Sequence, residues 1–134
     1  MNPLRWGSQH DVFLPEIDAE HRAVFLAGEE LHRALAGAAG PEKLAECWRN
    51  LLQLTEVHFR HEEQLMRDSG FESREWHGKQ HDAVRKRAQK VDTAHPESVT
   101  GFLEYMGVWL RDHTSVADRI MASHIRNWTR RRAA

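Results

Sequence analysis

The chain is poor in several features that mark particular classes of protein. It has one cysteine, Cys47, which excludes an internal disulfide and leaves too little sulfur for a thiolate metal site. No apolar run approaches the roughly 20 residues of a membrane-spanning helix, and the N-terminal residues lack the apolar segment of a secretory signal. The net charge of -1 gives no electrostatic reason to expect binding to nucleic acid or to a membrane. We therefore expect a cytoplasmic protein.

Histidine is the unusual component of the composition, with ten in 134 residues against one tyrosine. The rest, with 40% hydrophobic residues, 29% charged residues and four prolines, is ordinary for a helical protein. A chain of this length buries a core of its own. No linker or low-complexity segment divides it, so we expect residues 1–134 to form one domain.

Apolar residues recur every three or four positions in four segments, which is the spacing of amphipathic helices. The expected helices cover residues 18–37, 41–68, 73–91 and 97–123, after an irregular N-terminal arm, and the last stripe runs to Ile120. Short connections make consecutive helices antiparallel neighbours. The sequence therefore predicts an all-α, up-down-up-down four-helix bundle.

Several positions that these stripes reserve for apolar side chains are polar: His21, His58, Glu62, His77, His81 and His113. A single histidine in a core is usually only hydrogen-bonded. Two pairs here, His58 with Glu62 and His77 with His81, are spaced i,i+4, a turn of ~400° that lets both side chains reach one centre. Because a buried carboxylate needs a partner, five histidines around it on four facing helices indicate a metal site.

The types of ligand restrict the metal. Imidazole with carboxylate and without thiolate suits iron, zinc, manganese or copper. The set is too large for one ion and fits two. Few anionic carboxylates favour reversible binding over oxygen activation. The helical period does not predict Asp118 as a ligand, because it follows His113 by five residues, a turn of ~140°. From spacing alone, Asp118 is expected to be a solvent-exposed acid on the helix surface.

Four motifs, matched in order, resemble the hemerythrin family and its single-domain bacterial members. They are Trp6 with Leu14-Pro15-Glu16-Ile17-Asp18-x-x-His21, His58-Phe59-x-x-Glu62-Glu63-x-Leu65-Met66, His77-x-x-x-His81, and Trp109-Leu110-x-x-His113-x-x-x-x-Asp118. The resemblance implies a non-haem di-iron centre that binds O2 reversibly.

By the same resemblance, one iron is filled by His77, His81 and His113, and the other, which takes O2, is held by His21 and His58. Glu62 and Asp118 bridge the two irons together with a hydroxide or oxide. The expected O2 pocket consists of Phe59, Trp109, Leu110 and Thr114.

Two positions depart from the family pattern. Thr114 follows the last ligand histidine, where the family usually has an aliphatic residue. If its hydroxyl faces the pocket, we expect it to admit water and quicken autoxidation, so that Thr114→Ile would lengthen the life of the oxygenated form. Phe13 stands where glycine is common and changes only the packing of the arm. The remaining histidines (His10, His32, His61, His95 and His124) are expected at the surface.

Three classes of function are compatible with such a centre. The first is an O2 carrier, store or buffer that is not an enzyme. The second is an O2 or redox sensor, although no output domain is attached. The third is a di-iron enzyme or iron-handling protein that removes peroxide or NO or repairs iron–sulfur centres.

Overall fold

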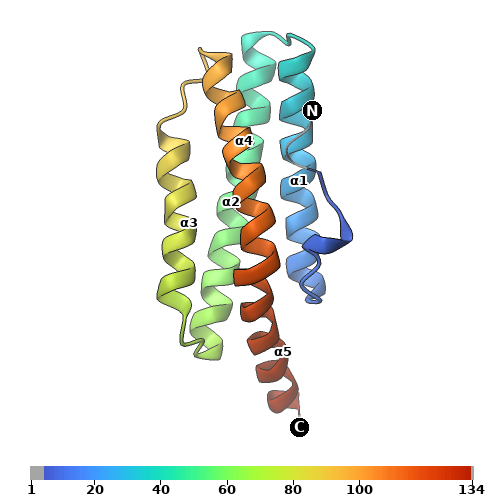
Figure 1. The fold of residues 1–134 in the computed structure, drawn as a ribbon, viewed down its shortest axis with the longest axis vertical. Coiled ribbons are helices and arrows are strands. Elements are labelled where there is room, and N and C mark those ends of the chain that lie inside the picture. Colours follow the sequence, from blue (N-terminus) through green and yellow to red (C-terminus); the bar gives the residue numbers. More distant parts are fainter. Residues whose placement is uncertain (1–4, 134) are drawn as a thin grey trace.

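Helices that pack side by side form an all-α four-helix bundle in the computed structural model, which describes residues 5–133 (Figure 1). The elements are η1 (Ser8–His10), α1 (Pro15–Ala36), α2 (Pro41–Ser69), α3 (Arg74–Gln89), α4 (Pro96–His113), η2 (Thr114–Asp118) and α5 (Arg119–Ala133). Over the residues described, no helix combines the length and the apolar character that crossing a membrane requires. The single-domain assignment stays a prediction.

Local chemistry sets the helix ends. Pro15, Pro41 and Pro96 each begin a helix, where the missing N–H costs nothing and the fixed φ suits the first turn. The helix α2 ends at Gly70, whose φ of 66° is left-handed. The N–H of Phe71 then donates to the carbonyl of Met66 (2.9 Å) and closes the cap. The first helix begins at Pro15, three residues before the predicted start.

The fourth helical rod of the bundle consists of α4, η2 and α5, and it differs from the predicted fourth helix in length and register. Together α4, η2 and α5 run without a break to Ala133, ten residues beyond the expected end, and α5 projects past the bundle (Figure 1). The segment η2 is a π-helical turn, which holds one residue more than an α-helical turn. That extra residue shifts the buried face, so Met121 is fully buried and Ile120, predicted in the core, is 52% exposed.

Apolar layers lie on both sides of the polar core positions along each helix. On α1, His21 follows buried Ile17 and precedes buried Val24, and on α2, Glu62 lies between buried Phe59 and Met66. The apolar residues toward the α1–α2 loop and those toward α5 belong to separate clusters. The bundle thus holds a polar layer between two apolar ones.

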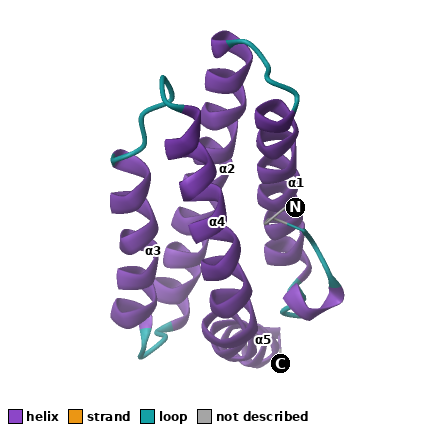
Figure 2. Cartoon of the chain, turned by 45° about the horizontal axis from the view of Figure 1, so that its top comes forward, coloured by secondary structure: helices purple, strands orange, loops and turns teal. Residues whose placement is uncertain are grey.

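The N-terminal arm runs along the outside of α1 in both views (Figures 1 and 2). The Asp18 carboxylate accepts hydrogen bonds from the N–H groups of Val12 (2.9 Å) and Leu14 (3.3 Å). From the fourth rod, Arg126 donates to the carbonyls of Val12 and Phe13. The arm is therefore hydrogen-bonded to the first turn of α1 and to α5.

Phe13 adopts a φ of 62° and is 67% exposed. A left-handed conformation costs a residue with a Cβ roughly 1–2 kcal/mol, whereas glycine adopts it freely but loses about 0.5–1 kcal/mol of backbone entropy on folding. We expect Phe13→Gly to raise the free energy of unfolding of the metal-free protein by about 0.5–1 kcal/mol in urea titrations. Phe13→Ala, which keeps the Cβ, is the control, and an equal gain from both variants would contradict the explanation.

Candidate metal centre

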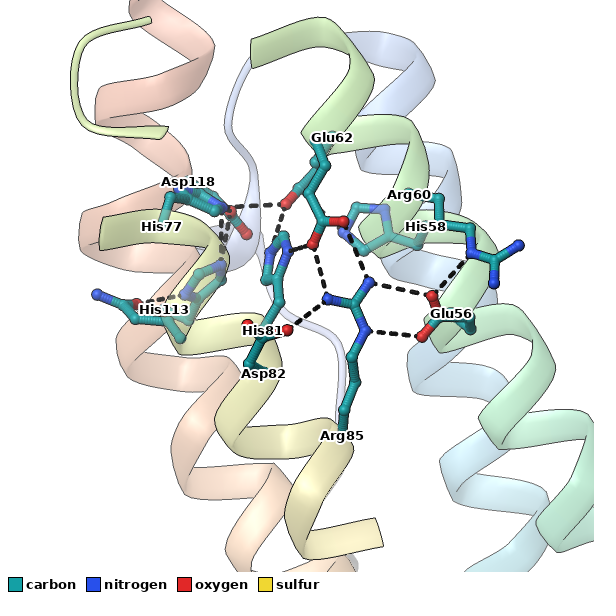
Figure 3. A network of polar contacts seen from close by, with 12 residues as sticks. Glu56, His58, Arg60, Glu62, His77, His81, Asp82, Arg85, His113 and Asp118 are labelled. Carbon is teal, nitrogen blue, oxygen red and sulfur yellow. Dashed lines mark hydrogen bonds and ion pairs between the residues drawn. The ribbon is translucent and has the colours of Figure 1, made fainter. Parts of the chain in front are cut away.

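All seven residues expected as metal ligands lie in the polar layer, and none is more than 4% exposed. Their order along the elements is His21 on α1, His58 and Glu62 on α2, His77 and His81 on α3, His113 at the end of α4 and Asp118 at the end of η2. Figure 3 shows residues from α2, α3 and the fourth rod turned toward a common centre. The bundle therefore brings side chains from all four rods to one place.

Their ligand atoms form two groups, within each of which the atoms lie no more than 4.8 Å apart. One group is Glu62, His77, His81 and His113, and the other is His21, His58, Glu62 and Asp118. Each group has the composition of an imidazole–carboxylate metal site.

Glu62 belongs to both groups through different oxygens. Its Oε1 lies 3.1 Å from His77 Nε2 and 3.0 Å from His81 Nε2. Its Oε2 lies 2.9 Å from His58 Nε2 and 3.4 Å from His21 Nε2. One carboxylate thus faces both sets of imidazoles.

Asp118 repeats this arrangement. Its Oδ1 lies 2.9 Å from His113 Nε2 and 3.2 Å from His77 Nε2, and its Oδ2 lies 3.1 Å from His21 Nε2. Two carboxylates that each divide their oxygens between the same two sets of imidazoles match a pair of bridged cations. Three histidines face one position and two face the other, so the two positions are not equivalent.

The π-helical turn explains why the helical period missed Asp118. On an α-helix, residues five apart diverge by ~140°. In η2 the backbone hydrogen bonds join residues five apart instead of four, so the side chains of His113 and Asp118 lie on the same face of the helix. Only the resemblance to a family pointed to this residue, since its spacing from His113 did not.

Buried atoms without hydrogen-bond partners show that the site suits metal ions. In the described part of the chain these include His21 Nε2, His81 Nε2, Glu62 Oε2 and both carboxylate oxygens of Asp118. The two imidazole nitrogens lie 3.0–3.4 Å from oxygens of Glu62 and Asp118, yet these contacts do not have the geometry of hydrogen bonds. Buried polar atoms left without partners are costly, and cations placed between them would satisfy them.

Hydrogen bonds on the outer side of three imidazoles prepare them as ligands. Nδ1 of His58 lies 2.8 Å from Glu20, that of His81 lies 2.8 Å from Glu63, and that of His113 lies 2.7 Å from Gln80. Each of these partners presents an oxygen, so Nδ1 donates and Nε2 keeps the lone pair that a metal needs. The three outer residues lie on polar helix faces. Glu63 belongs to the second motif, but the sequence predicted no role for it, and nothing in the sequence pointed to Glu20 or Gln80.

Arg85 holds one of these outer carboxylates. It donates to Glu63 (2.9 Å) and makes two bonds to Glu56 (2.8 and 3.0 Å), as Figure 3 shows in part. Burial opposes ionisation of Glu63, but the hydrogen bonds from His81 and Arg85 outweigh it and lower the pKa of Glu63 to about 2. Glu63 is therefore an anion that fixes the orientation of His81.

Of the residues expected to line the O2 pocket, the two aromatic ones stack on histidines of the three-histidine group and not on His21 or His58. Phe59 stacks on His81 (ring centroids 3.9 Å apart), and Trp109 stacks on His113 (4.2 Å). Leu110 and Thr114 are buried. The Thr114 hydroxyl donates to the Leu110 carbonyl (2.7 Å). The rings of Phe59 and Trp109 thus shield the group with three histidines.

Two histidines expected at the surface are not free there. His10 is only 4% exposed, and its Nδ1 lies 2.9 Å from the Thr114 hydroxyl. His61 is 30% exposed, and its Nδ1 lies 2.7 Å from the second oxygen of Glu20. The prediction was wrong for His10, because the arm folds back onto the bundle and buries the His10 ring against Phe25.

The metal-free centre holds protons that a metal would displace. Burial lowers the pKa of His58, but Glu62 and Glu20 outweigh burial and raise it to about 10. For His77, Asp118 and Glu62 likewise outweigh burial and raise the pKa to about 9. The same contacts with imidazoles lower the pKa of Glu62 despite its burial.

Comparisons with known proteins agree with this geometry. The family model "Hemerythrin HHE cation binding domain" matches residues 12–125. A bacteriohemerythrin of Clostridium acetobutylicum is 23% identical over 122 residues, covering 85% of this chain and 95% of that protein. A bacteriohemerythrin of Aquifex aeolicus is 34% identical (63% and 69% covered), and a myohemerythrin of Theromyzon tessulatum is 30% identical (59% and 60% covered). No solved structure matches significantly.

Removing the Glu20 carboxylate should weaken metal binding beside His58. Outer partners of this kind contribute about 10–100-fold to metal affinity, so we expect a loss of that size for one of two Zn²⁺ ions in Glu20→Ala, measured by competition with a chelator. Glu30→Ala, an exposed carboxylate on the same helix, is the control. Equal affinities in the two variants would refute the role of Glu20.

Metal binding should release protons at neutral pH. His58 and His77 are protonated below pKa values of about 10 and about 9 in the metal-free protein, and a metal requires their lone pairs. At pH 7.5 we expect Zn²⁺ binding to release about two protons per chain, fewer as the pH rises toward 10, and to weaken as the pH falls. Calorimetry in buffers of different ionisation enthalpy measures this number, and a heat independent of the buffer would contradict it.

Proposed function

Because the chain belongs to the hemerythrin family, we propose that it binds O2 reversibly at two iron ions held by the seven residues of the polar layer. His77, His81 and His113 would hold one ion, and His21 and His58 would hold the other. Glu62 and Asp118 would each offer one oxygen to either ion, together with a hydroxide or oxide from solvent. The observation that carries the proposal is the unequal number of histidines around two shared carboxylates.

That inequality leaves room for O2 on one side only. Three histidines and both carboxylates would give one ion five protein ligands, whereas two histidines and the same carboxylates would give the other only four and leave room for O2. A pair of ferrous ions would supply the two electrons that O2 takes up on binding. O2 would therefore bind on the side of His21 and His58.

The side chains around the centre support binding over turnover. Five imidazoles and two carboxylates carry less negative charge than a carboxylate-rich centre, so they stabilise the oxidised ions less. The buried ring of Phe59 and the half-buried ring of Trp109 cover His81 and His113 and keep water from that side of the centre. A dry, histidine-rich centre lets O2 leave as O2, so we propose a carrier, store or buffer and not an enzyme. The cytoplasmic location stays a prediction.

Anaerobic loading with Fe(II) followed by exposure to air tests the proposal. We expect about two irons per chain and a visible absorption band that appears with O2 and disappears when O2 is removed. Glu62→Gln, which keeps the shape of the side chain but removes the bridging charge, should bind less iron and lose the reversible band. A single iron per chain in the wild type, or immediate and irreversible oxidation, would contradict the proposal. Turnover of peroxide or NO would point to an enzyme instead.

A further inference from the structure

The arm places an imidazole inside the molecule that none of the family motifs includes. His10 ends the short turn η1 and is 4% exposed. Its ring contacts those of Phe25 (centroids 4.6 Å apart) and Trp6 (5.5 Å), which also contact each other (5.5 Å). Arg119 donates to the carbonyls on either side of His10, those of Gln9 (2.8 Å) and Asp11 (3.2 Å). The backbone around this histidine is therefore held against the fourth rod.

The hydrogen bonds of Thr114 decide which nitrogen of His10 carries the proton. Thr114 Oγ1 lies 2.7 Å from the Leu110 carbonyl, which can only accept, so the single hydroxyl proton points there. His10 Nδ1, 2.9 Å from the same oxygen, must then donate to it. The result is a chain from His10 Nδ1–H to the Thr114 hydroxyl and on to the Leu110 carbonyl.

We propose that His10 is a positioning residue that keeps the Thr114 hydroxyl turned away from the metal centre, and that this pair prolongs the life of the oxygenated protein. Thr114 directly follows the ligand His113 and opens the π-helical turn that carries Asp118. Its hydroxyl donates a hydrogen bond to the Leu110 carbonyl and accepts one from His10. It therefore has no proton left to offer to a water molecule at the centre.

The pair also explains how a polar residue is tolerated at this position. A buried hydroxyl or N–H without a partner draws in water or destabilises the fold. Here the His10 N–H donates to the Thr114 hydroxyl, and that hydroxyl donates to the Leu110 carbonyl. On this proposal Thr114→Ile would shorten the life of the oxygenated form, contrary to the expectation from the sequence, because the aliphatic side chain would leave the His10 N–H without an acceptor. The effect on the life of the oxygenated protein rests on the proposed function, whereas the hydrogen-bond chain does not.

Two substitutions test the hydrogen-bond donor of His10 apart from its aromatic ring. His10→Phe keeps an aromatic ring against Phe25 and Trp6 but cannot donate a hydrogen bond. His10→Asn loses the ring but has an N–H near the position of Nδ1. We expect His10→Phe to shorten the life of the oxygenated protein, because the Thr114 hydroxyl loses the donor that holds it in place, and His10→Asn to recover part of the lifetime. Thr114→Val alone should also shorten it, and adding Thr114→Val to His10→Phe should restore it, because no unpaired group remains. Unchanged lifetimes in both single variants, or a longer lifetime in Thr114→Val, would overturn the proposal.

A measurement without iron or O2 tests the hydrogen-bond chain by itself. In zinc-loaded protein, ¹⁵N resonances of His10 should show a proton on Nδ1 and none on Nε2. The effects of His10→Phe and Thr114→Val on unfolding should be non-additive. If the proton lies on Nε2, the inference is wrong even in a protein that binds O2. If the chain and the coupling are found but no O2 binds, the proposed function fails while the positioning by His10 stands.

Discussion

The structure depends on the burial of two carboxylates among five imidazoles in the middle of a helical bundle. Glu62 and Asp118 are both fully buried, and within residues 5–133 their ion-pair partners are histidines, with no arginine or lysine among them. In the metal-free protein, protonated histidines provide the compensating charge, which is why the pKa values of His58 and His77 are raised. Two divalent ions would provide it more completely, since they would also satisfy the buried atoms that lack partners.

Several departures from regular structure follow from this centre. The fourth rod contains a π-helical turn because His113 and Asp118 must point to the same place across five residues. Carboxylates on the polar faces of α1 and α2 turn inward to orient the ligand imidazoles, and Arg85 holds one of them. The arm, with Phe13 in a left-handed conformation, carries His10 to the hydroxyl of Thr114. Backbone strain and buried polar groups thus collect around the polar layer, as is common at functional sites.

Much of the fold and most of the site follow from the sequence alone. The helical period predicts four helices and places His21, His58, Glu62, His77, His81 and His113 on their inner faces, because every one of them replaces an apolar residue in a regular stripe. It fails at η2, where one extra residue moves Asp118 inward and Ile120 outward. It also fails for His10, whose partner Thr114 lies 104 residues away, because no local pattern encodes such a contact. Glu20 and Glu63 look like surface acids until the neighbouring helix is in place.

The central claim is that Glu62 and Asp118 each join two metal ions. Anomalous diffraction at the iron edge from crystals of the iron-loaded protein tests it most directly. The account predicts two peaks about 3.5–4 Å apart, one beside His77, His81 and His113 and the other beside His21 and His58, with one oxygen of each carboxylate on each ion. A single peak, or two ions that share neither carboxylate, would contradict it.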